Sequence, residues 1–84
     1  MIHDLKTWPD PFAALKAGVK THEVRKNDRG FKVGDTLLLR EWDPYAQIHT
    51  GRQINASVTY ISEGGTFGLP PELCVMSIKV TGGR

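Results

Sequence analysis

The chain has 84 residues, of which 39% are hydrophobic and 24% are charged. This length suits one domain, and the composition is typical of a globular protein rather than a disordered one. No apolar run approaches the ~20 residues of a membrane span, and the first residues lack a basic-then-apolar signal pattern. We therefore predict a single domain over residues 1–84 with a cytoplasmic location and no membrane partner.

The positive charge is concentrated in one segment. Residues 16–32 contain six basic and two acidic side chains, whereas residues 1–15 and 33–84 each contain one more acid than base. The overall net charge of +2 is too small to indicate a nucleic-acid partner by itself. The segment is either part of a binding surface or an ordinary solvated strand and turn.

The first predicted elements are a strand and a short helix. Residues 2–6 are short and mixed in character, as expected at the edge of a sheet. Asp10 followed by Pro11 predicts a helix whose N-cap is Asp10 and whose first helical position is Pro11. Gly18 is placed to end this helix, which is so short that it must pack on other elements to persist.

A second strand is predicted over residues 21–26. The period of two in this segment puts Glu23 and Arg25 on the same face. Neither face is fully apolar, which is unusual for a core strand. Turn-forming residues follow at positions 27–30 and 33–35.

The middle of the chain predicts two strands joined by a loop. Residues 36–42 predict a central strand, and residues 43–51 predict a hairpin loop. Alternation over residues 53–61 predicts a half-buried strand whose inward-facing residues include Tyr60.

The last part of the chain predicts a mobile loop over residues 62–72, a strand over residues 74–80 and a frayed tail over residues 81–84. Cys74 is the single cysteine, so an internal disulfide is excluded. Its apolar neighbours indicate a buried thiol rather than a reactive one.

One helix followed by closely spaced strands predicts the fold class. We expect a mixed α+β, mainly β domain: a small pseudo-barrel of about five strands with one short N-terminal helix. A parallel α/β sheet fits the pattern less well, because no helices separate the later strands.

Common chemical motifs do not explain the chain. It contains no P-loop and no dinucleotide-binding glycine motif, and its histidines and cysteine lack metal-ligand spacing, so no metal and no cofactor are expected. What remains is the group formed by Lys20, Glu23 and Arg25 at the start of a strand. Arginine offers a planar fork that suits a phosphate or a base edge, and lysine offers a point charge. A structural ion pair along the strand explains the same residues equally well.

Residues 17–25 resemble the G-x-K-x-x-E-x-R signature of the ASCH domain, a branch of the PUA-like superfamily. The matching positions are Gly18, Lys20, Glu23 and Arg25. Residues 31–39 are similar to the Gly–Asp turn and strand that follow in that superfamily. The segments at 3–6, 25–29 and 40–43 look like a short bacterial and phage subgroup of unassigned function.

This resemblance implies a pseudo-barrel with a helix across one opening and a ligand cleft beside that helix. The chain would then be a module that holds RNA or a nucleotide-like small molecule. The candidate ligand-binding residues are Lys6, Lys20, Glu23, Arg25, Lys26, Asn27, Arg29 and Trp42. Trp42 and Tyr45 are candidates for stacking on a base, although a structural position at a strand end explains Trp42 better.

The resemblance also implies an enzymatic alternative. Some ASCH proteins are amidohydrolases that act on acetylated cytidine with a lysine, a threonine and a glutamate. The family lysine corresponds to Lys20, but the family threonine aligns with Glu23, which leaves Thr21 and Glu63 as candidate catalytic substitutes. A carboxylate cannot replace a hydroxyl nucleophile in amide cleavage, so binding ranks above catalysis.

A third alternative is an accessory domain that binds a partner protein through a strand edge. It predicts an exposed apolar edge and no ligand cleft. The sequence leaves the oligomeric state open.

Overall fold

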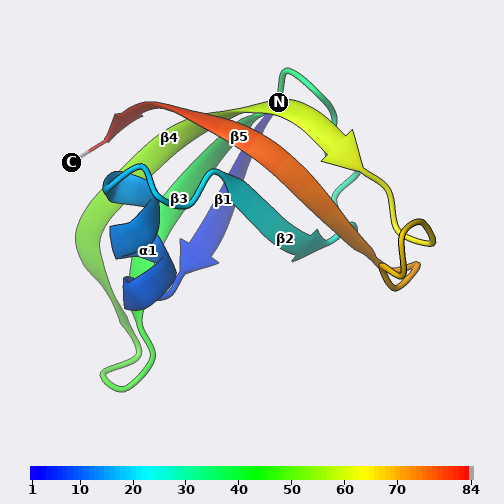
Figure 1. Ribbon diagram of the computed structural model, residues 1–84. Helices are drawn as coiled ribbons and strands as arrows, with labels where there is room; N and C mark the ends of the chain where they lie inside the picture. Colours follow the sequence, from blue (N-terminus) through cyan, green and yellow to red (C-terminus); the bar gives the residue numbers. More distant parts are fainter. Residues whose placement is uncertain (84) are drawn as a thin grey trace.

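The structure is a computed structural model that describes residues 1–83. Its elements in chain order are β1 (Ile2–Thr7), α1 (Pro9–Lys16), β2 (His22–Lys26), β3 (Thr36–Asp43), β4 (Ile48–Ser62) and β5 (Leu73–Gly83). The strands form one sheet in the order β1-β3-β4-β5-β2, in which β1 and β3 are parallel and the other pairs are antiparallel. The predicted mainly β fold with one short helix is therefore confirmed (Figure 1).

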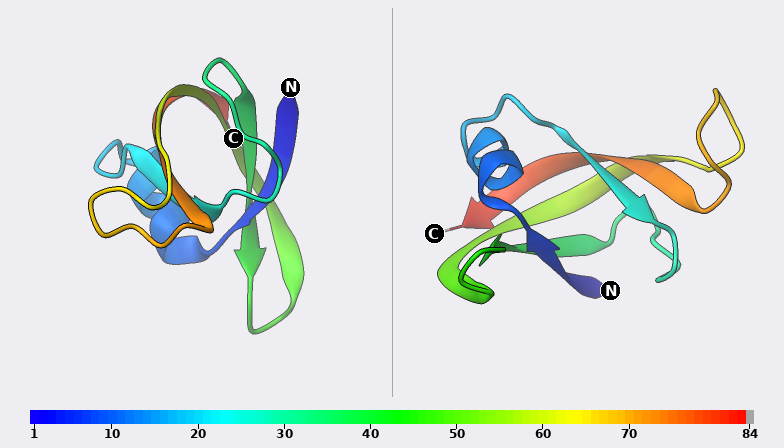
Figure 2. Two further views of the ribbon diagram at one scale, coloured as in Figure 1. Left: turned by 90° about the vertical axis from the view of Figure 1, so that its right-hand side faces the viewer. Right: turned by 90° about the horizontal axis from the view of Figure 1, so that it is seen from below.

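The sheet curls because its longest strands bend. Register shifts lie between Asn55 and Ala56 and between Val58 and Tyr60, where β4 pairs with β5. Such bulges bend a strand and increase its local twist. Seen end-on, the sheet forms an arc (Figure 2). The result is a half-barrel whose two edge strands are β1 and β2.

One hydrophobic core fills the half-barrel. The helix contributes Phe12 and Leu15, each only 1% exposed. A helix this short needs such packing to persist, as expected from the sequence. The other core residues come mainly from the strands: Leu5, Phe31, Leu37, Leu39, Ile54, Ala56, Val58, Cys74, Met76 and Ile78. The predicted buried thiol of Cys74 is confirmed, and burial raises its pKa.

The prediction that Asp10 caps the helix is wrong. Trp8 occupies the N-cap position without a side-chain hydrogen bond, and Pro9 begins the helix. The first turn of a helix leaves its N–H groups without intrahelical partners, so the prolines at 9 and 11 are both tolerated there. Asp10 instead lies inside the first turn, where its charge favours the helix dipole.

The prediction that Tyr60 faces inward is also wrong. The bulge around Thr59 reverses the alternation, so Tyr60 pairs with Ser77 and is 64% exposed. Ile61 packs against the core in its place. A period of two cannot reveal an extra residue in a strand, because bulges depend on pairing with the neighbouring strand.

Two predicted loop boundaries are corrected. The hairpin turn is shorter than residues 43–51, because β4 already begins at Ile48 and pairs with Asp43. Residues 81–83 do not fray but extend β5 beside Ile54 and Asn55; Arg84 lies outside the described residues. Within residues 1–83, no helix has the length and apolar character needed to cross a membrane.

A buried polar contact fixes the start of β1 to the turn before β3. His3 Nε2 lies 2.8 Å from Asp35 Oδ2, and the backbone N–H of Lys32 donates to the same oxygen. His3 also packs edge-on against the Phe31 ring. The hydrogen bond with His3, followed by that from Lys32, lowers the pKa of Asp35 despite the opposing effect of burial.

This contact predicts a loss of stability in acid. Because the folded state lowers the pKa of Asp35, the unfolded chain binds more protons between the two pKa values, and stability falls as the pH drops through that range. We expect Asp35→Asn to be less stable at neutral pH and to lose less stability on acidification. Urea unfolding at neutral and acidic pH measures both effects. Asp28→Asn, at an exposed loop position, is the control. An unchanged acid dependence in Asp35→Asn would contradict the prediction.

Candidate functional site

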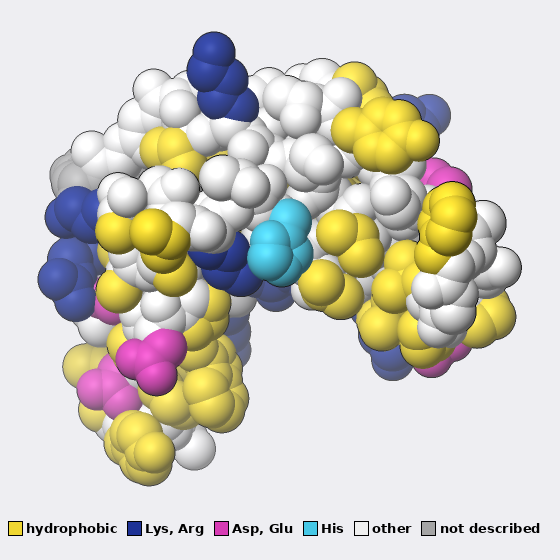
Figure 3. All heavy atoms as spheres, viewed as in Figure 1, with side chains coloured by type: hydrophobic (Ala, Val, Ile, Leu, Met, Phe, Trp, Pro, Cys, Tyr) yellow, Lys and Arg dark blue, Asp and Glu magenta, His cyan; other side chains and the backbone are white. Residues whose placement is uncertain are grey.

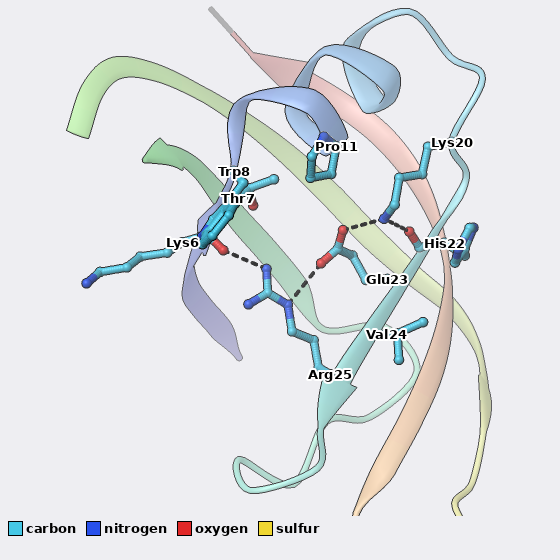
Figure 4. A pocket seen from close by; sticks show the side chains of 9 residues that line it. All are labelled: Lys6, Thr7, Trp8, Pro11, Lys20, His22, Glu23, Val24 and Arg25. Atoms are coloured by element: carbon cyan, nitrogen blue, oxygen red, sulfur yellow. Dashed lines mark hydrogen bonds and ion pairs between the residues drawn. The ribbon is translucent and has the colours of Figure 1, made fainter. Parts of the chain in front are cut away.

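The candidate site is built around a buried carboxylate on β2. Glu23 is only 4% exposed, whereas its neighbour Val24 is 47% exposed. The alternation of the strand therefore turns Glu23 inward, and Arg25 lies on the same side of the strand, as the spacing predicted. Lys20 Nζ donates to Glu23 Oε1 at 2.8 Å, and Arg25 Nε donates to Oε2 at 2.9 Å. Each carboxylate oxygen thus has its own cation (Figure 4).

The same arginine connects the two free edges of the half-barrel. Arg25 Nη2 donates to the carbonyl oxygen of Lys6 on β1 at 2.8 Å. Further along the gap, Arg29 Nη1 donates to the carbonyl oxygen of Asp4 at 2.9 Å. Alternate carbonyls of a strand point to the same side, so both arginines serve the same edge of β1. Side chains, rather than a further strand, bridge the gap between β1 and β2.

A cavity of about 350 Å³ opens over this group. This cationic cavity lies between β1, the start of α1 and β2 (Figure 4), on a face that is hollowed between two lobes (Figure 3). Its volume is near the small end of the range for ligand pockets. It is lined by Lys6, Thr7, Trp8, Pro11, Lys20, His22, Glu23, Val24 and Arg25.

The cations keep unused hydrogen-bond donors. Lys20 donates two hydrogen bonds, one to Glu23 and one to the carbonyl oxygen of His22. Arg25 also donates two, one to Glu23 and one to the carbonyl oxygen of Lys6. One N–H of Lys20 and three of Arg25 therefore have no partner among residues 1–83. With Glu23 ionised, the trio has a net charge of one positive unit. Such an arrangement favours a ligand with an anionic or acceptor group.

Sequence reasoning missed several lining residues, of which Trp8 is the most important. Its side chain is 60% exposed beside the cavity. The hydroxyl of Thr7, in the same wall, is buried and has no partner in the described part of the chain. An aromatic residue followed directly by Pro9 at a helix start is the available signal, because proline fixes the backbone there.

Two ligand candidates contribute differently from the prediction. Lys6 takes part through its backbone, while its ammonium lies 4.0 Å from the centroid of the Trp42 ring. Trp42 packs edge-on against His49 and does not line the cationic cavity. These contacts agree with a structural role for Trp42, which is the interpretation that the sequence favoured. Tyr45 also lies outside this cavity.

The remaining candidates lie toward the other end of β2 and line none of this cavity. Lys26 is exposed, and Arg29 is engaged with β1. Asn27 accepts a hydrogen bond from the backbone of Phe31. Of the basic residues in segment 16–32, Lys20 and Arg25 line the cationic cavity.

The candidate catalytic residues are not brought together. Lys20 lines the cavity, but Thr21 does not. Glu63 lies near Asn27, at 3.5 Å, beyond the opposite end of β2. Within the part of the chain that the structure describes, no group of three metal-ligating side chains converges either.

A second buried carboxylate, that of Glu41, has hydrogen-bond partners that give it a structural role. Glu41 is 2% exposed and accepts hydrogen bonds from Thr50 at 2.7 Å and from Arg52 at 2.8 Å. Burial alone would raise its pKa, but these hydrogen bonds and the charge of Arg52 outweigh burial and lower it. This cluster holds β3 to the start of β4.

The pairing around Glu23 predicts a stability effect. In Glu23→Ala, Lys20 and Arg25 lose their counter-charge, and their mutual repulsion is left without compensation. The two cations are 22% and 25% exposed, so water offsets part of this loss. We expect destabilisation of about 2 kcal/mol, measured by urea unfolding. Glu72→Ala, which removes an exposed carboxylate, should change stability little; equal effects of the two variants would contradict the prediction.

Comparison with known proteins identifies relatives. The family described as "Domain of unknown function (DUF3850)" matches residues 2–78. The "Uncharacterized 12.9 kDa protein in GpA 3'region" of Escherichia phage P2 is 37% identical over 62 residues, or 74% of this chain and 55% of that protein. The chain thus spans about half the length of this relative. Since the family match covers both the Glu23 cluster and nearly the whole half-barrel, the chain belongs to the DUF3850 family.

Proposed function

We propose that the cationic cavity binds a nucleotide unit, either as a free nucleotide or as part of single-stranded RNA. The observation that carries this proposal is the pair formed by Lys20 and Arg25, which a buried carboxylate holds in place while their remaining N–H groups stay unused. A phosphate or a base edge supplies the acceptors that these groups lack.

Glu23 acts in this proposal as a positioning residue. Its two oxygens are engaged, and it is nearly inaccessible. It orients the two cations before a ligand arrives, so less conformational freedom is lost on binding. The idea that Glu23 itself accepts a base amino group therefore has less support than a role through Lys20 and Arg25.

The shape of the cavity also supports a nucleotide. Trp8 offers an exposed aromatic surface beside the cations, and stacking on such a surface tolerates any base. A volume of about 350 Å³ suits one nucleoside or nucleotide rather than a duplex. The resemblance of Gly18, Lys20, Glu23 and Arg25 to the ASCH signature agrees with a ligand site here, and we extend membership of the PUA-like superfamily to this chain as part of the proposal.

Titration of nucleotides and short single-stranded RNA at two salt concentrations tests binding. Lys20→Ala and Arg25→Ala should each weaken binding by on the order of 1–3 kcal/mol. Lys26→Ala is the matched control: it also removes one positive charge, from β2 but outside the cavity. Since only a few phosphates can touch so small a surface, the dependence on salt should be modest.

Arg25 also bridges the sheet edges, so folding must be checked by circular dichroism. Arg25→Lys keeps the charge but not the planar fork, and it should bind more weakly than wild type while remaining folded. If the wild-type chain binds none of these ligands at low salt, or if Arg25→Ala binds no worse than Lys26→Ala, the proposal fails.

The enzymatic alternative makes a separate prediction. Because neither Thr21 nor Glu63 lines the cavity with Lys20, we expect no measurable hydrolysis of N4-acetylcytidine. Release of acetate, followed by chromatography of the nucleoside, measures it. Turnover that disappears in Lys20→Ala but persists in Lys26→Ala would revive an amidohydrolase function. A protein-interaction module has less support, because it does not account for the cationic cavity.

A further inference from the structure

A second cavity adjoins the cationic cavity. This aromatic groove has a volume of about 370 Å³ and lies between the start of α1 and the hairpin that joins β3 to β4. It shares Trp8 and Pro11 with the cationic cavity. Its lining residues are Trp8, Pro9, Asp10, Pro11, Pro44 and Tyr45.

The two aromatic residues of the groove are not used by the core. Tyr45 is 97% exposed and Trp8 is 60% exposed. Figure 3 shows hydrophobic side chains gathered on the lobe that carries α1 and the hairpin, with acidic side chains beside them. Tyrosine and tryptophan in such positions offer flat surfaces on which a planar group can stack.

The backbone on both sides of the groove is restricted by prolines and by turn hydrogen bonds. Prolines at 9, 11 and 44 fix the backbone on both sides. On the hairpin, Asp43 Oδ1 accepts hydrogen bonds from the backbone N–H groups of Tyr45 at 2.9 Å and Ala46 at 3.1 Å, which locks the turn that presents Tyr45. Restricting the backbone in this way reduces the conformational entropy that binding would cost.

Charge separates the roles of the two cavities. Among the described residues, Asp10 is the one charged side chain that lines the groove, and it is acidic. A phosphate is therefore repelled there, whereas it is attracted by Lys20 and Arg25 next door. The groove suits a neutral ring, and the carboxylate of Asp10 can accept a hydrogen bond from an amino group on that ring.

We propose that the aromatic groove is a second base subsite, so that the ligand unit is two successive nucleotides of a single strand rather than one free nucleotide. This inference rests on the proposed function and deepens it. One nucleotide occupies the cationic cavity, and the base of its neighbour enters the groove between Trp8 and Tyr45. Trp8 lines both cavities and so contacts both nucleotides.

The test compares two ligands of equal charge. A nucleoside phosphate methyl ester and a dinucleoside monophosphate each have one negative charge, and they differ by the second nucleoside. Wild type should bind the dinucleoside monophosphate roughly tenfold more tightly, because one additional base is stacked. Isothermal titration or competition against a labelled RNA oligomer measures both affinities.

Variants of Tyr45 isolate the groove, since Tyr45 lines only the second cavity. Tyr45→Ala should abolish most of the tenfold gain and leave the affinity for the methyl ester unchanged, while Tyr45→Phe should retain the gain. Tyr60→Ala is the matched control, because Tyr60 is also exposed but lines neither cavity.

The outcomes distinguish the two proposals. If wild type binds the methyl ester but gains nothing from the second nucleoside, or if Tyr45→Ala keeps the gain, the second subsite is overturned and the proposed function stands. If wild type binds neither ligand, both proposals fall. A loss of the gain in Tyr60→Ala equal to that in Tyr45→Ala would also overturn the subsite, because it would point to a general surface effect.

Discussion

The buried carboxylate of Glu23 is the constraint on which the open side of the half-barrel depends. It holds Lys20 and Arg25 at 2.8 and 2.9 Å, and the held arginine then reaches the carbonyl of Lys6 across the gap. A closed barrel would satisfy that edge with backbone hydrogen bonds from a neighbouring strand. In this chain a charged side chain replaces the neighbour, and the replacement leaves space for a cavity.

This arrangement couples the stability of the domain to its proposed site. Arg25 and Arg29 satisfy carbonyl groups on β1 that would otherwise face solvent at a sheet edge, while Lys20 holds the other oxygen of Glu23. A ligand that engages Lys20 and Arg25 would neutralise the excess positive charge of the group. Binding and closure of the edge would then strengthen each other through the same atoms.

Local pattern accounts for the parts of the fold that the sequence predicted. The helix, the succession of strands along the chain and the buried thiol of Cys74 follow from periodicity and turn residues over short distances. Proximity of Glu23 and Arg25 follows from their spacing on β2, and Lys20 lies just before that strand. Three features depend instead on contacts between distant segments: the inward position of Ile61, the place of Trp8 in the cavity wall and the hydrogen bond from Arg25 to β1. A local sequence pattern does not contain this information.

Energetics also separate the two explanations of the cluster around Glu23. Burying an ion pair costs desolvation that its attraction only partly offsets, and an apolar replacement is often as stable. Stability alone therefore gives a weak reason for burying the charge of Glu23. The charges have one property that apolar residues lack: they leave oriented N–H donors facing a cavity beside an exposed aromatic ring. That property suits the ligand proposed above, and it is the physical reason why we propose a binding role for the cluster in addition to its structural one.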